Sequence, residues 1–385
     1  MALTVSDLSD EITQSDIRTM SVECERLGGI NLAQGICDLD MPEIVRSAAA
    51  EAMAKGENYY TRHDGTDGLR TAIAEKVRAY NGITADPETE IIVSAGTTGA
   101  FYCTCMALLE KGDEVILFEP YYGYHLATIA AVGARATYVS LRPPEWTFDA
   151  DDLQRAATSR TKAIMVCTPS NPCGKVFSRA ELDIIADFAV RNDLFVFTDE
   201  IYEYVLFDGR KHVSPGALEA ISDRTITIGG YSKTYSITGW RIGYAVCDRR
   251  WSEIIGQMND LIYVCAPAPL QWGVAAGIRQ LPSSYYEDLC RAYLQKRDSI
   301  CNALRNGGLA PLIPQGAYYV LADIAHLPGE SDKEKAMFLL RETGVASVPG
   351  SAFYRDSADV NLARFCFAKS DEDLADACHR LSRMS

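Results

Sequence analysis

The feature that most constrains the fold is an alternation of apolar and helical segments over more than half of the chain. The apolar runs lie at 90–96, 113–120, 161–169, 194–200 and 225–233. Segments between them, such as 179–192, carry apolar residues at helical spacing. Strands that are apolar on both faces and separated by helices are typical of parallel sheets covered on both sides. The pattern therefore predicts an α/β fold with a mostly parallel central sheet.

The pattern changes after about residue 285. A long helical segment, 284–306, leads into shorter strand-like segments and a final amphipathic helix. This order of segments predicts a smaller α+β domain. The first forty-odd residues are expected to pack with it because they precede the regular alternation of strands and helices. We therefore expect a large domain over 46–284 and a small domain formed by 1–45 and 285–385.

Charge and cysteine usage exclude several classes of function. The 37 basic and 52 acidic residues give a formal charge of −15, which argues against nucleic acid or an anionic membrane as a partner. The twelve cysteines lack zinc-site spacing and several lie in apolar runs, so we expect no metal site and a reducing, cytoplasmic environment. Residues 1–20 include acidic residues and no apolar core, so no signal peptide is expected, and no run is long enough to span a membrane.

Small, polar or charged residues follow four of the expected strands. They are Gly96-Thr97-Thr98-Gly99, Asn171-Pro172-Cys173-Gly174, Asp199-Glu200-Ile201-Tyr202 and Lys233. Each has a plain structural alternative: a helix cap, a turn, or a lysine that extends from a partly buried strand end. Together they are more informative, because the carboxyl ends of the strands of a doubly wound sheet form the ligand crevice.

The chemistry of these groups predicts one cofactor. A buried lysine can lose its proton and form a Schiff base with an aldehyde. The free N–H groups of a helix that follows a glycine turn can bind a phosphate. A buried carboxylate can keep a pyridine nitrogen protonated. A lysine, a carboxylate and a phosphate site together predict pyridoxal 5'-phosphate (PLP).

The stretch 231–244, YSKTYSITGWRIGY, resembles the class I/II PLP-dependent aminotransferases, which belong to the aspartate aminotransferase superfamily of fold type I. The order of this motif after N-P-x-G and D-E-x-Y is also that of the family, and the resemblance extends from about Asn31 to the C-terminus. It implies transfer of an amino group between an L-amino acid and a 2-oxo acid. It also implies a homodimer with a shared active site.

The resemblance implies a role for each residue at the strand ends. Lys233 would form the Schiff base and move the proton, and Asp199 would pair with the pyridine nitrogen. Tyr202 and Asn171 would hydrogen-bond the phenolic oxygen of the cofactor. The residues implied to bind the phosphate are Gly96, Thr97, Thr98, Ser232 and Arg241.

Four further residues have implied roles outside these motifs. Tyr122 would stack on the pyridine ring, with its neighbouring tyrosines leaving the register open by one. Tyr60 would reach the phosphate of the other subunit. Arg364 would clamp the substrate α-carboxylate, and Gly35, like Asn171, would lie on the substrate side.

Departures from the family pattern leave the substrate class open. Gly230 stands where a serine is common, and Cys37-Asp38-Leu39 replaces a usual proline-aspartate-phenylalanine. No second arginine that could bind a side-chain carboxylate is obvious in the sequence, which argues weakly against a dedicated aspartate enzyme. Arg62, His63 and His125 have no assigned role.

Two alternatives to transamination remain at this point. The same fold and PLP motifs serve β-lyases, oxidases and synthases, which only product analysis separates. A non-catalytic PLP-binding regulatory module is the alternative of another class, and such proteins often carry a DNA-binding extension.

Overall fold

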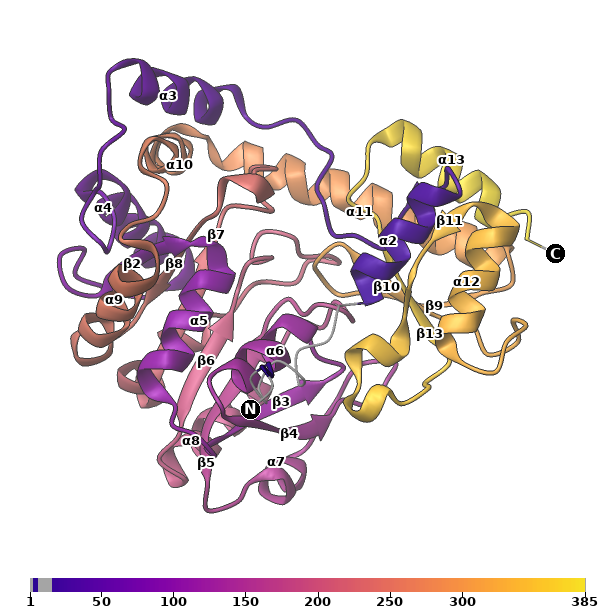
Figure 1. The fold of residues 1–385 in the computed structure, drawn as a ribbon, viewed down its shortest axis with the longest axis horizontal. Helices are drawn as coiled ribbons and strands as arrows, with labels where there is room; N and C mark the ends of the chain where they lie inside the picture. Colours follow the sequence, from indigo (N-terminus) through magenta and orange to yellow (C-terminus); the bar gives the residue numbers. More distant parts are fainter. Residues whose placement is uncertain (1–2, 6–15, 385) are drawn as a thin grey trace.

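The computed structural model describes residues 3–5 and 16–384 and is built around a seven-stranded sheet in the order β2-β8-β7-β6-β5-β3-β4 (Figure 1). Its strands are β2 (Ile91–Ala95), β3 (Glu114–Glu119), β4 (Arg135–Ser140), β5 (Thr161–Cys167), β6 (Phe195–Asp199), β7 (Thr225–Gly230) and β8 (Ile242–Val246). Strand β8 is antiparallel to both β2 and β7, and the other pairs are parallel. The expected α/β fold with a mostly parallel sheet is confirmed, with β4 and β8 as strands not foreseen.

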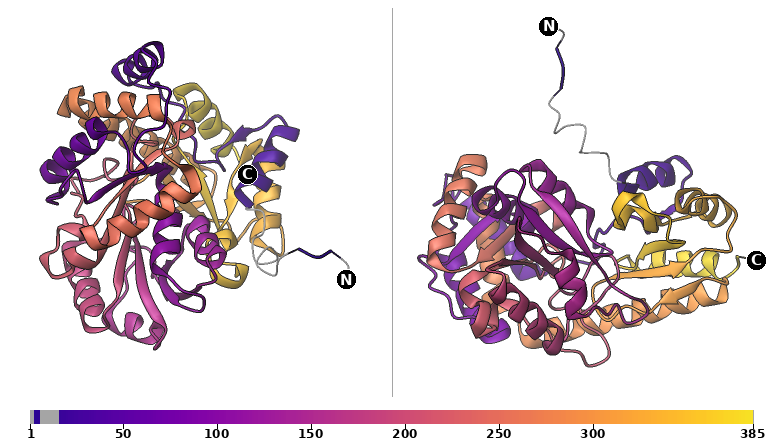
Figure 2. Two further views of the ribbon diagram at one scale, coloured as in Figure 1. Left: turned by 60° about the vertical axis from the view of Figure 1, so that its left-hand side comes forward. Right: turned by 90° about the horizontal axis from the view of Figure 1, so that it is seen from below.

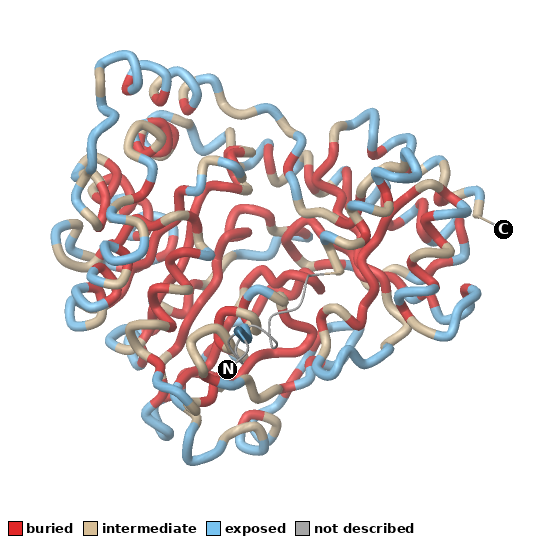
Figure 3. Tube along the Cα trace, viewed as in Figure 1, coloured by how far each residue is buried: buried red, intermediate tan, exposed pale blue. Residues whose placement is uncertain are grey.

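Helices cover both faces of this sheet. They are α4 (Asp67–Lys76), α5 (Gly96–Leu108), α6 (Gly123–Ala131), α7 (Ala150–Ala156), α8 (Arg179–Arg191), α9 (Arg249–Tyr263) and α10 (Ala268–Gln280). Helix α3 (Glu43–Ala54) packs on α10. A π-helix, η1 (Val77–Asn81), follows α4 directly. Consecutive residues of β3 pack into different clusters, Val115 and Leu117 into one and Ile116 and Phe118 into another. The near-continuous apolar strands are therefore buried on both faces (Figure 3).

A second, smaller sheet has the order β12-β13-β10-β9 and is antiparallel. Its strands are β9 (Ala310–Leu312), β10 (Tyr319–Asp323), β12 (Val348–Pro349) and β13 (Leu362–Cys366). The helices on this side are α2 (Asp16–Arg26), α11 (Ser283–Asn306), α12 (Asp332–Thr343) and α13 (Asp371–Leu381). Helix α11 runs from the large sheet to the small one (Figure 1).

The N-terminal segment packs against the C-terminal part of the chain. Strand β1 (Ile30–Asn31) pairs in parallel with β11 (Val345–Ala346). Helix α2 lies beside the same region in both views of Figure 2. The domain boundaries at 45/46 and 284/285 stay a prediction, since α3 and α11 lie next to or across them.

Short 3-10 turns complete the described elements. They are η2 (Pro215–Ala217), η3 (Glu219–Arg224), η4 (Thr238–Trp240), η5 (Gly350–Phe353) and η6 (Arg355–Ser357). No helix in the described part of the chain is both long enough and apolar enough to cross a bilayer. The expectation about a signal peptide in 1–20 falls largely outside the described residues.

Candidate active site

The carboxyl edge of the large sheet opens into a cavity of about 810 Å³. Strand β8 runs against its neighbours, so its beginning lies at the edge where β2 and β7 end. Eleven of the predicted site residues line this cavity: Gly35, Thr97, Thr98, Tyr122, Asn171, Asp199, Tyr202, Ser232, Lys233, Arg241 and Arg364. Of the remaining two, Gly96 lies beside the cavity against Arg241, and Tyr60 does not line it.

The connection between β7 and β8 carries both basic residues of the YSKTYSITGWRIGY motif. Lys233 follows the end of β7, and Arg241 directly precedes β8 in a left-handed backbone conformation with φ +56°. The chain therefore leaves and re-enters the sheet at one edge with a cation near each end of the turn. This topology explains why the lysine and the arginine are separated by eight residues.

The Lys233 side chain is half-buried at the edge of the cavity. Its Nζ donates a hydrogen bond to the Gly35 carbonyl at 3.0 Å, and the Tyr318 hydroxyl donates to the same oxygen at 3.1 Å. Burial lowers the pKa of Lys233 from its usual value, because removing water disfavours the charged form. A lowered pKa increases the fraction of the nucleophilic amine at neutral pH.

Asp199 is held by two partners. Its Oδ2 lies 3.0 Å from the His125 Nε2, and its Oδ1 accepts a hydrogen bond from the Ile201 N–H at 3.2 Å. The His125 ring is fixed in turn by edge contacts with Phe101 and Tyr122, at centroid distances of 5.1 and 5.3 Å. His125, which had no assigned role, therefore orients the carboxylate that faces the cavity.

The tyrosines before α6 have different positions. Tyr122 lines the cavity, and burial raises its pKa. Tyr121 packs instead into the core beside Tyr138, with ring centroids 5.6 Å apart. Tyr124 also reaches the cavity but is exposed. Of the three tyrosines, Tyr122 is thus the one that is half-buried and lines the cavity.

Arg364 is almost fully buried, and only some of its hydrogen-bond donors have partners. Its guanidinium donates to the Asn171 Oδ1 and to the Ala33 carbonyl, each at 2.7 Å. The rings of Tyr319 and Phe353 lie 4.2 and 4.8 Å from its Cζ. Its Nε has no partner among the described residues. A buried guanidinium with an unused donor matches a carboxylate ligand.

Tyr202 meets a residue that the sequence did not indicate. Its hydroxyl lies 3.1 Å from that of Tyr319, and burial raises the pKa of both. Tyr319 thus contacts both Tyr202 and Arg364, so it links the predicted cofactor side and substrate side of the cavity. A side chain at Gly35 would collide with the Tyr319 hydroxyl, which explains the glycine there.

The phosphate end of the cavity is formed by the first turn of α5. Ala95 precedes this helix without a side-chain cap in the described structure, so the first N–H groups of α5 are free to bind an anion. Gly96 has φ +73°, and a Cβ there would lie 2.5 Å from an Arg241 guanidinium nitrogen. The glycine therefore allows the arginine to approach the helix N-terminus. Thr97 and Thr98 add hydroxyl groups to the same place.

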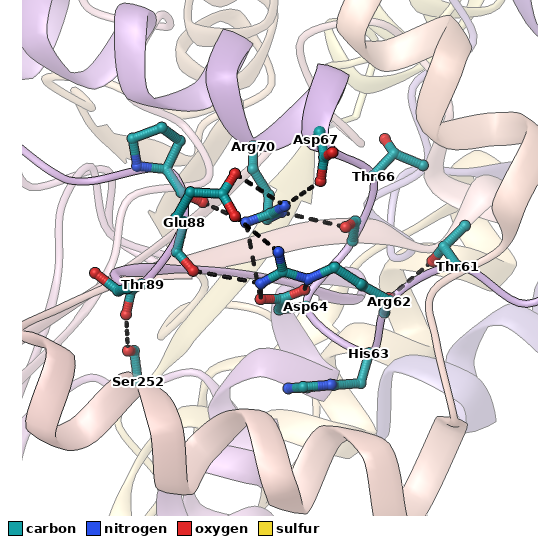
Figure 4. A network of polar contacts seen from close by, with 12 residues as sticks. Thr61, Arg62, His63, Asp64, Thr66, Asp67, Arg70, Glu88, Thr89 and Ser252 are labelled. Carbon is teal, nitrogen blue, oxygen red and sulfur yellow. Dashed lines mark hydrogen bonds and ion pairs between the residues drawn. The ribbon is translucent and has the colours of Figure 1, made fainter.

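The loop that carries Tyr60 is anchored by a network of ion pairs (Figure 4). Arg62 donates to Asp64 at 2.9 and 2.6 Å and to Glu88 at 2.8 Å. Arg70, fully buried, bonds to the carbonyl of Pro87 at 2.5 Å. Arg62 therefore pairs with acids of its own chain, which gives it a structural role in this loop.

His63 has a local role in this loop. Its carbonyl accepts a hydrogen bond from Asn259 Nδ2 at 2.5 Å, and its ring lies against Gly256 of α9. The loop is thus attached to α9 through the carbonyl and the ring of His63. Tyr60 itself is 82% exposed.

A second buried network lies behind the turn that carries Asp199 and Tyr202. Glu203 forms an ion pair with Lys76 and accepts a hydrogen bond from Asn81 Nδ2 at 2.9 Å. Lys76 and Asn81 are five residues apart, and the π-helix η1 brings both to one carboxylate.

Glu200 extends this network. It accepts hydrogen bonds from Thr198 at 2.8 Å and Ser214 at 2.9 Å, and its Oε2 lies 2.6 Å from the His212 Nε2. Ligand atoms of Glu200, Glu203 and His212 lie within 4.8 Å of one another, a spacing that a metal ion could use. Lys76 already supplies a cation to Glu203, which makes the cluster an internal ion network.

Sequence reasoning missed three kinds of residue at this site. His125 and Tyr319 lie in aromatic stretches that read equally well as core. Glu200 and Glu203 alternate with Asp199 and Tyr202 in DEIYE, and that alternation was the available signal. Residues of α2, which line the cavity, belong to an ordinary amphipathic helix with no chemical motif.

The fold and the site together define an α/β enzyme of the fold type I class, with a lysine beside the carboxyl edge of its large sheet. The sequence matches the family "Aminotransferase class I and II" over residues 28–381, and the chain belongs to this family. It is an aminotransferase, and the family depends on PLP. The predicted resemblance is therefore confirmed.

Relatives of named function match nearly all of the chain. A probable N-succinyldiaminopimelate aminotransferase of Mycobacterium tuberculosis is 36% identical over 94% of each chain. The aromatic-amino-acid aminotransferase 2 of Thermococcus litoralis is 33% identical over 99% of this chain and 98% of that protein. The solved N-succinyldiaminopimelate aminotransferase from M. tuberculosis superposes with a TM-score of 0.95, at 35% identity and full coverage of both chains.

Proposed function

We propose that this aminotransferase binds PLP at the carboxyl edge of its large sheet and uses Lys233 as its catalytic base and acid. The observation that carries the proposal is the convergence of four groups on one cavity. They are a half-buried lysine with a lowered pKa, a fixed carboxylate, an uncapped helix N-terminus beside an arginine, and a second arginine with an unused donor.

The residues present fit the cofactor in kind and in place. The first turn of α5 and Arg241 would hold its phosphate, and Asp199 would pair with its ring nitrogen. Tyr202 and the free Nδ2 of Asn171 would donate to its phenolic oxygen, since the Asn171 Oδ1 already accepts from Arg364. When bound, PLP supplies an electron sink for the bond-breaking step at the substrate Cα.

The side chains of this chain then have distinct roles. Arg364 binds the α-carboxylate of the amino acid and so fixes the direction of the Cα–H bond. The Lys233 amine would take the proton from the substrate Cα and hold it as an ammonium until it is returned. Asp199, oriented by His125, stabilises positive charge on the ring nitrogen. The second substrate, a 2-oxo acid, uses the same residues in reverse.

We extend the proposal to a homodimer with shared active sites. Tyr59 and Tyr60 are exposed, and so are Leu261 of α9 and Trp272 of α10. Exposed aromatic and apolar side chains of this kind favour a protein interface. Tyr60 would then complete the phosphate site of the partner. A monomer in solution at micromolar concentration would contradict this part.

The substrates are proposed as an L-amino acid and a 2-oxo acid. The names of the relatives cover aromatic, methionine and N-succinyldiaminopimelate aminotransferases, so they do not select one donor. A reducing, cytoplasmic location is proposed because all twelve cysteines are free.

The test is the visible absorbance of the purified protein after PLP is supplied. Addition of a reactive amino acid without an oxo acid should bleach the visible band, and a 2-oxo acid should restore it. Lys233→Ala should abolish both changes, whereas Lys211→Ala, an exposed lysine, should leave them unchanged. Release of ammonia or peroxide with no recovery would favour a lyase or an oxidase instead.

A further inference from the structure

The Tyr319 hydroxyl lies among the residues proposed to hold the cofactor, although it is not one of them. Tyr319 is the first residue of β10, a strand of the small sheet, and it lines the cavity although it is only 2% exposed. Its hydroxyl lies 3.1 Å from that of Tyr202, which follows β6 of the large sheet. Tyr319 therefore brings a polar group from the small sheet to the cofactor side of the cavity.

Contacts on several sides fix this hydroxyl in place. A Cβ at Gly35 would lie 1.9 Å from the Tyr319 oxygen, so the oxygen packs directly against the Gly35 backbone. The Gly35 carbonyl in turn accepts a hydrogen bond from the Lys233 Nζ at 3.0 Å. The Tyr319 ring lies 4.2 Å from the Arg364 Cζ and meets the Tyr202 ring edge-on, with centroids 5.9 Å apart. These contacts hold the Tyr319 hydroxyl at that of Tyr202.

The two hydroxyl groups form an isolated pair. Within the part of the chain that the structure describes, neither hydroxyl has a second hydrogen-bond partner. Each hydroxyl has one proton to donate and two lone pairs that can accept. If Tyr202 donates its proton to the phenolic oxygen of the cofactor, the proton between the two hydroxyls must come from Tyr319.

Burial keeps that proton on Tyr319. Removal from water raises the pKa of the Tyr319 hydroxyl because a buried phenolate is poorly solvated, although the neighbouring Arg364 acts in the opposite direction. Tyr319 therefore remains a hydrogen-bond donor at neutral pH. A hydroxyl that accepts a hydrogen bond is polarised by it and donates its own proton more strongly.

We propose that Tyr319 is a positioning residue for the reaction: its hydroxyl donates to Tyr202 and so directs the Tyr202 proton at the phenolic oxygen of the cofactor. This inference rests on the proposed function and adds a residue to it. Donation to the phenolic oxygen stabilises negative charge there, so the bound cofactor takes up a proton only at a lower pH. Removal of the Tyr319 hydroxyl should therefore move the midpoint of that protonation to a higher pH.

The experiment is a pH titration of the visible absorbance of the full-length protein supplied with PLP, without substrate. Tyr319→Phe keeps the ring beside Arg364 and removes only the hydroxyl. It should raise the midpoint of the absorbance change by about 0.3–1 pH unit. It should also lower kcat about twofold to tenfold while KM stays within about twofold, because the substrate contacts remain.

The control is Tyr231→Phe, which removes a buried hydroxyl that has no partner among the described residues. This variant should leave both the midpoint and kcat unchanged. The other titratable or charged groups around the two hydroxyls are the same in every variant; they are Tyr122, Asp199, Arg364, Tyr318, Cys37 and Cys366.

A double-mutant cycle tests whether Tyr319 acts through Tyr202. Tyr202→Phe alone should raise the midpoint more than Tyr319→Phe does, since it removes the direct donor. Addition of Tyr319→Phe to Tyr202→Phe should change the midpoint little further, because the hydroxyl through which Tyr319 acts is then absent.

The outcomes separate this inference from the proposed function. Additive shifts in the double variant, or no upward shift in Tyr319→Phe, would overturn the inference alone when the band of the unchanged protein still bleaches with an amino acid and recovers with a 2-oxo acid. The absence of a visible band in the unchanged protein would overturn the proposed function, and this inference with it.

Discussion

The floor of the cavity differs from its α2 wall, the side formed by residues 17–25 of helix α2. On the floor, Asp199, Arg364 and Tyr202 are buried, and each has protein partners that fix its orientation. On the wall, Arg18 and Glu25 are exposed and have no partner in the described structure. Side chains that act in the reaction need a fixed geometry. Side chains that recognise a ligand need hydrogen-bonding groups or charges that are not already paired within the protein. The floor therefore holds fixed side chains, whereas the α2 wall leaves two charged side chains free to meet solvent or a ligand.

The largest expected effect is on the floor. Lys233→Ala should lower turnover by about a thousandfold or more, because it removes the group that moves the proton. The assay is amino-group transfer from the best donor at saturating 2-oxo acid. Retention of more than a tenth of the activity would mean that another base serves the reaction.

The network behind the floor should dominate stability. Lys76→Met leaves the Glu203 carboxylate buried without its cation and should lower the free energy of unfolding by about 3–5 kcal/mol. Lys333→Met, which breaks the more exposed pair with Asp16, should cost less than about 1 kcal/mol. Urea unfolding of both variants gives the comparison. Similar losses of unfolding free energy in the two variants would show that burial does not determine how much an ion pair contributes to stability.

Arg364→Lys tests whether geometry or charge matters on the floor. Lysine keeps the positive charge but loses the fork that binds a carboxylate through two hydrogen bonds. We expect kcat/KM to fall about a hundredfold for every donor alike, since each donor has an α-carboxylate. A loss restricted to dicarboxylic donors would instead assign Arg364 to side-chain selection and reverse the comparison.

Alkaline pH should weaken the large domain through its buried tyrosines. Burial raises the pKa of Tyr231 well above its unfolded value of about 10, so stability present below pH 10 is lost as pH rises further. Tyr231→Phe should therefore reduce the loss above pH 10 by up to about 1.4 kcal/mol per pH unit. Its hydroxyl has no partner among described residues, so little change is expected at pH 7. The measurement is urea unfolding of both proteins at pH 7 and 11. The same decrease in unfolding free energy between these pH values in Tyr231→Phe and in the unchanged protein would contradict the prediction.

The smallest effect is expected on the stability of the wall. Arg18→Gln and Glu25→Gln should change the free energy of unfolding by no more than about 0.5 kcal/mol, with gains favoured by the helix dipole. Thermal unfolding in the absence of substrate tests this. A loss above about 1 kcal/mol for Arg18→Gln would give that residue a structural role.

The same contrast explains what the sequence could predict. The parallel sheet was predictable because strands buried on both faces are apolar throughout. The site residues at the strand ends were predictable because cofactor chemistry demands particular residue types there. Strand β4 was not, since its residues are mostly only half-buried and lack a continuous apolar run. Strand β8 was hidden inside the YSKTYSITGWRIGY motif, where the functional pattern overlies the structural one.

The remaining parts of the site depend on distant contacts. His125 orients Asp199 across 74 positions of the sequence, and Lys233 meets the Gly35 carbonyl across 198. No local pattern encodes such pairs. The π-helix η1 was equally hard to predict. It places Lys76 and Asn81 against Glu203, and these contacts join distant parts of the sequence.

The two-residue pairing of β1 with β11 has a mechanical consequence. A pulling force applied at the N-terminal end of α2 loads this short parallel contact before it reaches the large sheet. The first rupture under tension should therefore release α2 and β1 while the seven-stranded sheet stays intact. A single molecule held beyond that rupture would keep its lysine-bearing edge but lose one side of the cavity, so tension would open the cavity before it unfolds the large sheet.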